Sequence, residues 1–277
     1  MSKYRKDSIT PKKENNFSSK IIIGAGILIL IILIIFMILK PKPINSVDFC
    51  PDSGPKGTTA LLIDLSDPLT PSQEQGLINE LNHITETSDT RKNSYVNKHA
   101  KLTTYFTNGT ETPDNIFSFC NPGSDSQLSN FDKMNENQIL YLRKWNKFSS
   151  ETIEKIKINI KSERSANTSP IIESLAYIRE KEFSPSDILL TDKNSNKILI
   201  VSDLIQNSEL YNQYKEDIEA KLVFNKKPIS FRGIEIYIFY ITSEKYKNIQ
   251  TTKFKNWWLQ YFNEGISGAS MKRWKPL

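Results

Sequence analysis

The sequence predicts an α/β protein with a mostly parallel central sheet and helices on both faces, preceded by one N-terminal transmembrane helix. Short apolar or β-branched runs at residues 58–65, 101–106, 197–202 and 233–241 are typical of strands. Segments with apolar residues at helical spacing lie between these runs. Strands that alternate with helices indicate a parallel sheet covered on both sides, as in Rossmann-like folds.

Four segments between the strands carry helical signals. The first is the best defined, because Thr70 can act as N-cap, Pro71 suits the first helical position, and Gln73 follows the cap by three residues. The four predicted helices cover residues 70–84, 150–160, 170–179 and 208–222.

The N-terminal part of the chain predicts a membrane anchor. Residues Ile21–Leu39 are all apolar or glycine, and Lys20 and Lys40 bracket them. Nineteen residues at about 1.5 Å each span roughly 28 Å, the thickness of a bilayer core. A cleaved signal peptide has a shorter apolar stretch and a small-residue cleavage site, so we expect an uncleaved transmembrane helix over 20–40.

The segments around this helix complete the predicted domain organisation. Residues 1–19 are polar and charged, and we expect a disordered basic tail in the cytoplasm. Residues 41–57 contain four prolines and predict an extended spacer. Residues 58–277 then form one domain, which ends with an aromatic segment.

The net charge of +6 comes from the N-terminal part of the chain. Residues 1–42 contain eight Lys or Arg and two acidic residues, which leaves 29 basic and 29 acidic residues in the rest. A neutral domain gives no support for nucleic-acid binding. Six basic residues precede the apolar run, so the positive-inside rule places the N-terminus in the cytoplasm and the domain outside. The alternative is a cytoplasmic domain, because Lys40 and Lys42 lie close to the other end of the run.

The chain has two cysteines, Cys50 and Cys120, and no CxxC motif. This count argues against a zinc site or a redox motif. In an oxidising compartment the two cysteines can form one disulfide, and otherwise they remain two free thiols.

Oxygen-bearing side chains follow the predicted strands. Asp64 and Ser66 come at the end of the first strand, Ser169 opens a helix, and Asp203 follows the strand at 197–202. Ligands of open α/β sheets bind beyond the carboxyl ends of the strands. Hard oxygen donors suit Mg²⁺ or Mn²⁺, so we expect a divalent metal site there.

These residues resemble the metal-ion-dependent adhesion site (MIDAS) of the von Willebrand factor A (vWA) domain, over about residues 58–245. The family pattern Asp-x-Ser-x-Ser matches at Asp64 and Ser66. Ser169-Pro170-Ile171-Ile172-Glu173-Ser174-Leu175 is similar to the family's Thr-Pro-Leu-Gly-Glu-Ala-Leu, and Asp203 matches the Asp of Leu-Thr-Asp-Gly. Pro68 stands at the second Ser position and offers no side-chain ligand, so Asp67 or Thr70 would have to compensate.

The chain also resembles a group of bacterial membrane-anchored proteins with this domain. The matching segments are Asp64–Thr70, Cys120–Gly123, Ser202–Asn207 and Trp257–Phe262. The resemblance implies a single-pass protein of the bacterial inner (cytoplasmic) membrane, with the domain on the periplasmic side.

The resemblance implies a binding module in which a carboxylate of a protein partner completes the metal shell. We expect the protein to be a subunit of a bacterial membrane-associated complex. The first alternative is a structural subunit with a degenerate metal site, which Pro68 favours. The second is a metal-dependent phosphohydrolase of the haloacid-dehalogenase type. That class needs a second aspartate two residues after the first, and Ser66 stands there. We therefore expect no enzymatic activity.

Overall fold

The computed structural model describes residues 17–39, 44–64, 66–85, 95–123, 138–161, 166–184, 195–264 and 270–277. The chain divides into two compact units, Met1–Pro41 and Lys42–Leu277. Residues 1–16 of the predicted disordered tail lie outside the described residues.

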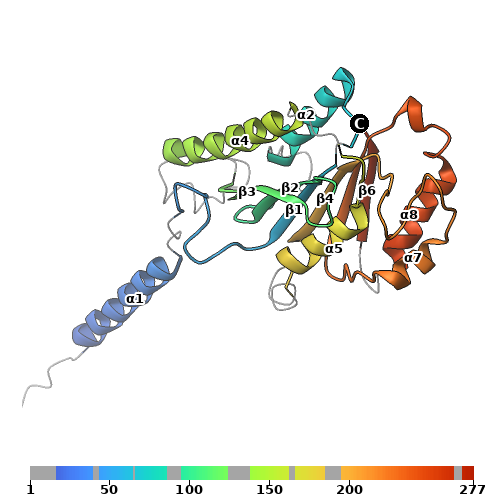
Figure 1. Cartoon of the computed structure of the whole chain (residues 1–277). Coiled ribbons are helices and arrows are strands. Elements are labelled where there is room, and N and C mark those ends of the chain that lie inside the picture. Colours follow the sequence, from blue (N-terminus) through green and yellow to red (C-terminus); the bar gives the residue numbers. More distant parts are fainter. Residues whose placement is uncertain are drawn as a thin grey trace, which may run out of the picture. The chain divides into compact units, whose positions relative to one another are not determined.

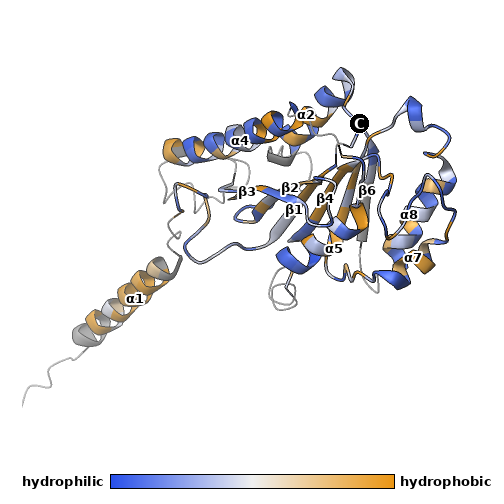
Figure 2. Ribbon diagram, in the orientation of Figure 1, coloured by the Kyte–Doolittle hydropathy of each residue, from blue (hydrophilic) through white to orange (hydrophobic). Residues whose placement is uncertain are grey.

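The first unit contains helix α1, Phe17–Leu39. Its described side chains are mainly apolar and exposed, and the ribbon of the helix is largely orange in Figure 2. A helix with the length and apolarity of a bilayer span is not found among the described residues. The predicted membrane span at 20–40 is therefore not confirmed.

The second unit is built on a six-stranded sheet in the order β3-β2-β1-β4-β5-β6 (Figure 1). All neighbouring strands are parallel except β2 and β3, so the predicted mostly parallel α/β sheet is confirmed. The strands are β1 Thr58–Ile63, β2 Lys101–Phe106, β3 Asp114–Cys120, β4 Asn196–Ser202, β5 Glu235–Tyr240 and β6 Ser270–Pro276.

Helices cover both faces of this sheet (Figure 1). On one face, α2 and α4 pack on Leu61, Ile63 and their neighbours. On the other face, α5, α7 and α8 pack on Ala60, Leu62 and their neighbours. Alternate residues of β1 point to opposite faces, which explains why this strand is buried along its whole length. The helices are α2 Pro71–Thr85, α4 Gln138–Lys161, α5 Ile171–Glu182, α7 Ala220–Lys226 and α8 Thr252–Glu264, and a 3₁₀ turn, η2, covers Glu244–Tyr246.

The predicted start of α2 forms as a reciprocal cap. The Gln73 amide donates to Thr70 Oγ1 at 3.3 Å, and the Thr70 amide donates to Gln73 Oε1 at 2.9 Å. Two of the amide groups that a helix start leaves without partners are thereby satisfied.

The prediction of a helix over 208–222 is wrong. In the structure Ser208 Oγ accepts from the Leu210 amide at 3.1 Å, and Asn212 Oδ1 accepts from the Tyr214 amide at 3.0 Å. These side chains compete with helical backbone bonds, so the segment forms turns until α7 begins at Ala220. Strands β3 and β6 were not predicted, and α4 begins twelve residues before the predicted start at 150.

The described part of the predicted spacer, residues 44–57, belongs to the folded unit. Phe49 is only 1% exposed, and its ring packs edge-on against Phe119 and Phe148. Cys50 and Cys120 form a disulfide, and the Cys120 amide donates to the Asp48 carbonyl at 2.8 Å. The proline-rich composition predicted extension, but one buried aromatic ring and one covalent link hold the segment against β3.

We expect the double substitution of Cys50 and Cys120 by serine to destabilise the domain by about 2–4 kcal/mol, because the disulfide closes a long loop of the unfolded chain. The two cysteines are separated by 70 residues. Urea unfolding monitored by circular dichroism measures the change. Reductant should weaken the native protein and leave the double variant unchanged; equal stability of the two proteins would contradict the expectation.

Candidate functional site

The candidate site lies at the point where the sheet reverses its strand order. The chain runs from β1 to β2 on one side, and β4 joins β1 on the other side. Asp64 directly follows β1, and Asp203 directly follows β4. The two strand ends are tied together, because the Asp64 amide donates to the Val201 carbonyl at 2.8 Å. Crevices at such switch points are the usual ligand sites of open α/β sheets.

The carboxylate of Asp64 is buried and accepts hydrogen bonds from three hydroxyl groups. Thr107 Oγ1 donates to Oδ1 at 2.7 Å. Ser169 Oγ and Ser202 Oγ donate to Oδ2 at 2.7 and 3.0 Å. Burial raises the pKa of Asp64, and the three hydroxyl groups partly oppose that rise.

Asp203 is the second buried carboxylate of the site, with 6% of its surface exposed. The Ile205 amide donates to its Oδ1 at 2.9 Å. Burial, followed by the negative charge of Asp64, raises the pKa of Asp203 to about 8. Two carboxylates in one buried site disfavour each other's ionised form, which a proton or a cation can relieve.

The backbone after Asp203 is strained. Leu204 has a φ of 60°, a conformation that residues with a side chain rarely adopt. Its amide donates to Ser202 Oγ at 2.7 Å, and its carbonyl accepts from Trp258 Nε1 at 2.8 Å. Trp258 is fully buried in α8, so the core holds the strained turn that positions Asp203.

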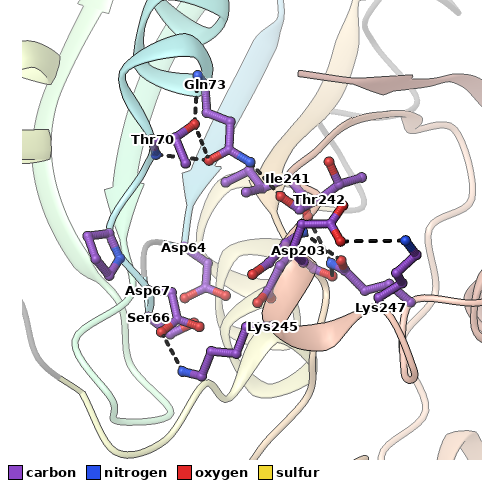
Figure 3. A pocket seen from close by; sticks show the side chains of 14 residues that line it. Asp64, Ser66, Asp67, Thr70, Gln73, Asp203, Ile241, Thr242, Lys245 and Lys247 are labelled. Carbon is purple, nitrogen blue, oxygen red and sulfur yellow. Dashed lines mark hydrogen bonds and ion pairs between the residues drawn. The ribbon is translucent and has the colours of Figure 1, made fainter.

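A cavity of about 550 Å³ opens at these two carboxylates (Figure 3). Its walls come from the loop after β1, the start of α2 and the loop after β5. The lining side chains belong to Asp64, Ser66, Asp67, Pro68, Thr70, Gln73, Asp203, Ile241, Thr242, Ser243, Glu244, Lys245, Lys247 and Gln250.

The structure brings most of the predicted site residues together. Asp64, Ser66, Asp67 and Asp203 all line the cavity. Ser169 is not among the lining residues, and its hydroxyl is committed to Asp64. Thr70 lines the cavity, but its hydroxyl contacts Gln73 Oε1 at 3.0 Å as part of the cap of α2.

Several residues of the site were missed by sequence reasoning. Thr107 directly follows β2, and Ser202 directly precedes Asp203, so both could have been found as further hydroxyl groups at strand ends. The loop after β5 supplies Lys245, Lys247 and Gln250 to the cavity. Because β5 pairs in parallel with β4, the loop after β5 reaches the same edge of the sheet as Asp203. The pairing of β5 with β4 is not visible in the sequence.

The donor set suits a hard divalent cation. Asp64 and Asp203 would supply charged oxygens, and the Ser66 hydroxyl would supply a neutral one, with water completing the shell. Among the described residues no cluster of three or more His, Cys, Asp or Glu side chains is placed to hold a metal. Any cation here would therefore depend on hydroxyl groups and water as well as the two carboxylates.

No protein-family profile matches the chain, and no curated protein is similar to it. Proximal thread matrix protein 1 from the mussel byssus, in crystal form 2, has a TM-score of 0.35 and 13% identity, over 72% of this chain and 42% of that one. The same mussel protein with a zinc-occupied MIDAS motif has a TM-score of 0.32 and 13% identity, over 69% of this chain and 39% of that one. The human COPII-coat protein Sec24c has a TM-score of 0.33 and 10% identity, over 84% of this chain and 32% of that one.

The chain spans less than half of the length of each of these three structures. Similarity at this level carries no inference about the fold or the function of this protein.

The stability of the metal-free domain should fall as the pH rises from about 4 to about 8. Folded Asp203 keeps its proton up to a pKa of about 8, whereas the unfolded chain releases it near the ordinary value of 3.8. The unfolded state therefore binds fewer protons than the folded state in this range. The free energy of unfolding falls by at most about 1.4 kcal/mol per pH unit for one such group.

Asp203→Asn should flatten this dependence, because an amide does not titrate. Chemical unfolding in chelator at several pH values measures the slope. Asp52→Asn, at an exposed position outside the site, is the matched control and should keep the native slope. Equal slopes for native protein and Asp203→Asn would show that Asp203 is not the titrating group.

Proposed function

We propose that the second unit is a vWA-like binding module that holds a divalent cation at Asp64 and Asp203 and presents it to a protein partner. The observation that carries this proposal is the pair of buried carboxylates that opens into the cavity, where the charge of Asp64 disfavours the ionised form of Asp203. The lining carries four carboxylates, of Asp64, Asp67, Asp203 and Glu244, and two ammonium groups, of Lys245 and Lys247. When all four carboxylates are ionised the excess is two negative charges, which one divalent cation offsets.

The cation supplies electrostatic attraction for an incoming carboxylate. Mg²⁺ and Mn²⁺ are the proposed ions, because the donors are all oxygens. The side chains of this site hold the cation and shape its surroundings: Asp64 and Asp203 bind it, Ser66 adds a neutral oxygen, and Gln250 braces the loop of Asp203 by donating to the Asp203 carbonyl at 3.4 Å. The partner's carboxylate would complete the shell in the way that the vWA resemblance implies.

A structural subunit with a degenerate metal site is the second candidate function. Two observations favour it. Pro68 replaces a potential hydroxyl ligand, and the three hydroxyl donors already compensate the Asp64 carboxylate without a cation. In this case the module would assemble with its partner in the absence of metal.

The phosphohydrolase alternative gains one observation. Lys245 lies in the cavity, where an ammonium group could bind a phosphate, but this group contacts Asp67 Oδ1 at 3.1 Å. Ser66 still occupies the position of the second aspartate, so we propose no enzymatic role. Metal-dependent hydrolysis of p-nitrophenyl phosphate that disappears in Asp203→Asn would reverse this view.

We propose that α1 anchors the protein in a bacterial cytoplasmic membrane, with the domain on the periplasmic side. The support is the uninterrupted apolar run Ile21–Leu39 and the excess of basic residues before it. The disulfide of Cys50 and Cys120 supports the same side, because such bonds persist in oxidising compartments. A cytoplasmic domain remains the alternative topology.

Addition of millimolar Mg²⁺ or Mn²⁺ should raise the melting temperature of the protein by several degrees. A ligand at 100 times its Kd stabilises the folded state by about 2.7 kcal/mol. Asp203→Asn should abolish the shift, and Asp52→Asn should retain it. Asp64→Ala is a poorer test, because it also leaves three buried hydroxyl donors without their acceptor. No shift in the native protein would contradict the metal-binding function and favour the structural subunit.

In cell fractionation the full chain should remain in the membrane pellet after alkaline carbonate extraction, since about 20 apolar residues insert stably. A variant without residues 1–41 should be released. Extraction of the full chain by carbonate would rule out the anchor.

Protease added to spheroplasts should remove the domain from the full chain. A protected domain would place it in the cytoplasm.

A further inference from the structure

The inference concerns Asp67, a third carboxylate of the cavity, which has binding partners of its own. Asp67 follows Asp64 by three residues, and its side chain is 35% exposed. Its Oδ1 atom accepts from Lys245 Nζ at 3.1 Å. Its carboxylate also forms a hydrogen bond with the Tyr246 side chain. Both partners belong to η2, and Figure 3 shows Lys245 reaching Asp67.

The loop that carries these partners is fixed at several points. Gln73 Nε2 donates to the Thr242 carbonyl at 2.5 Å, which joins the loop to the start of α2. Gln250 Nε2 donates to the Ile241 carbonyl at 2.9 Å, and Gln250 Oε1 accepts from the Ser243 amide at 2.8 Å. Lys245 Nζ also lies 4.6 Å from the centre of the Tyr246 ring. Lys245 is therefore presented to Asp67 from a braced loop.

We propose that Lys245 is a positioning residue that withholds Asp67 from the cation, and that Asp67 becomes a cation ligand when Lys245 releases it. This inference rests on the proposed metal-binding function. A carboxylate that pairs with an ammonium group offers less charge to a nearby cation, and the ammonium group itself repels the cation. Pro68, next to Asp67, offers no side-chain ligand to a cation. The cation's shell can therefore accept one more protein oxygen.

The arrangement also defines the chemistry of the partner. An acidic side chain of the partner can pair with Lys245 in place of Asp67. Asp67 is then free to bind the cation, so partner and cation bind cooperatively through the same lysine. The module would thus recognise a segment with an acidic residue close to the carboxylate that reaches the cation.

The test is a Mn²⁺ titration of the full chain in detergent, with free Mn²⁺ measured by electron paramagnetic resonance. Lys245→Met should tighten Mn²⁺ binding by about tenfold, the size of coupling expected between contacting groups. Asp67→Asn alone should change the affinity little, because Asp67 is withheld in the native protein. Lys245→Met combined with Asp67→Asn should lose most of the gain.

Lys247→Met is the matched control. Lys247 lines the same cavity, and its ammonium group lies 3.5 Å from Glu244 rather than near Asp67. Removal of this charge should change the affinity much less than Lys245→Met does. The Asp67–Lys245 pair is partly exposed, and such pairs contribute little to stability, so all variants should fold. Circular dichroism checks this.

The outcomes separate the two proposals. If Lys245→Met has no effect, or if the double variant binds as tightly as Lys245→Met alone, Asp67 is not a withheld ligand and this inference is wrong. The metal-binding function stands in either case, provided that Asp203→Asn abolishes Mn²⁺ binding. If the native protein and all variants fail to bind Mn²⁺, both proposals fall together.

Discussion

The buried carboxylate of Asp64 is the interaction on which the candidate site depends. Its three hydroxyl donors come from three parts of the chain: Thr107 from the end of β2, Ser169 from the turn before α5, and Ser202 from the end of β4. An isolated buried charge is costly, and hydrogen bonds from well-placed donors offset that cost. The requirement to satisfy one carboxylate therefore fixes the relative positions of three loops at the edge of the sheet.

The same carboxylate determines the state of Asp203. The negative charge of Asp64 adds to the effect of burial and favours the protonated form of Asp203. A cation would replace that proton, so cation affinity should depend on pH through the same pair of groups. The strained backbone at Leu204 keeps the second carboxylate close to the first, and the fully buried Trp258 holds that backbone in place. Strained backbone of this kind costs stability and is concentrated at functional sites, which agrees with the proposed ligand site.

The two faces of the sheet contribute differently to this arrangement. The face with α5, α7 and α8 supplies the aromatic core that holds the turn after β4. Residues 44–57 pack on the face with α2 and α4, where Phe49 and the disulfide attach this segment to β3. The site lies where the loops of both faces meet, and bonds such as that of Gln73 to the Thr242 carbonyl join the two walls of the cavity.

The sequence by itself determined the α/β class, the four central strands and the cap of α2, because apolar periodicity and capping chemistry are local signals. It also identified Asp64, Ser66 and Asp203 as neighbours, since residues at the carboxyl ends of parallel strands share one edge. It failed at 208–222, where side-chain bonds of Ser208 and Asn212 replace the helix that the apolar spacing predicted. Only the tertiary structure decided the placement of Thr107, Lys245 and Gln250, the committed role of the Ser169 hydroxyl, and the raised pKa of Asp203. These properties depend on which strands are adjacent and on how deeply each group is buried, and neither is encoded in the spacing of residues along the chain.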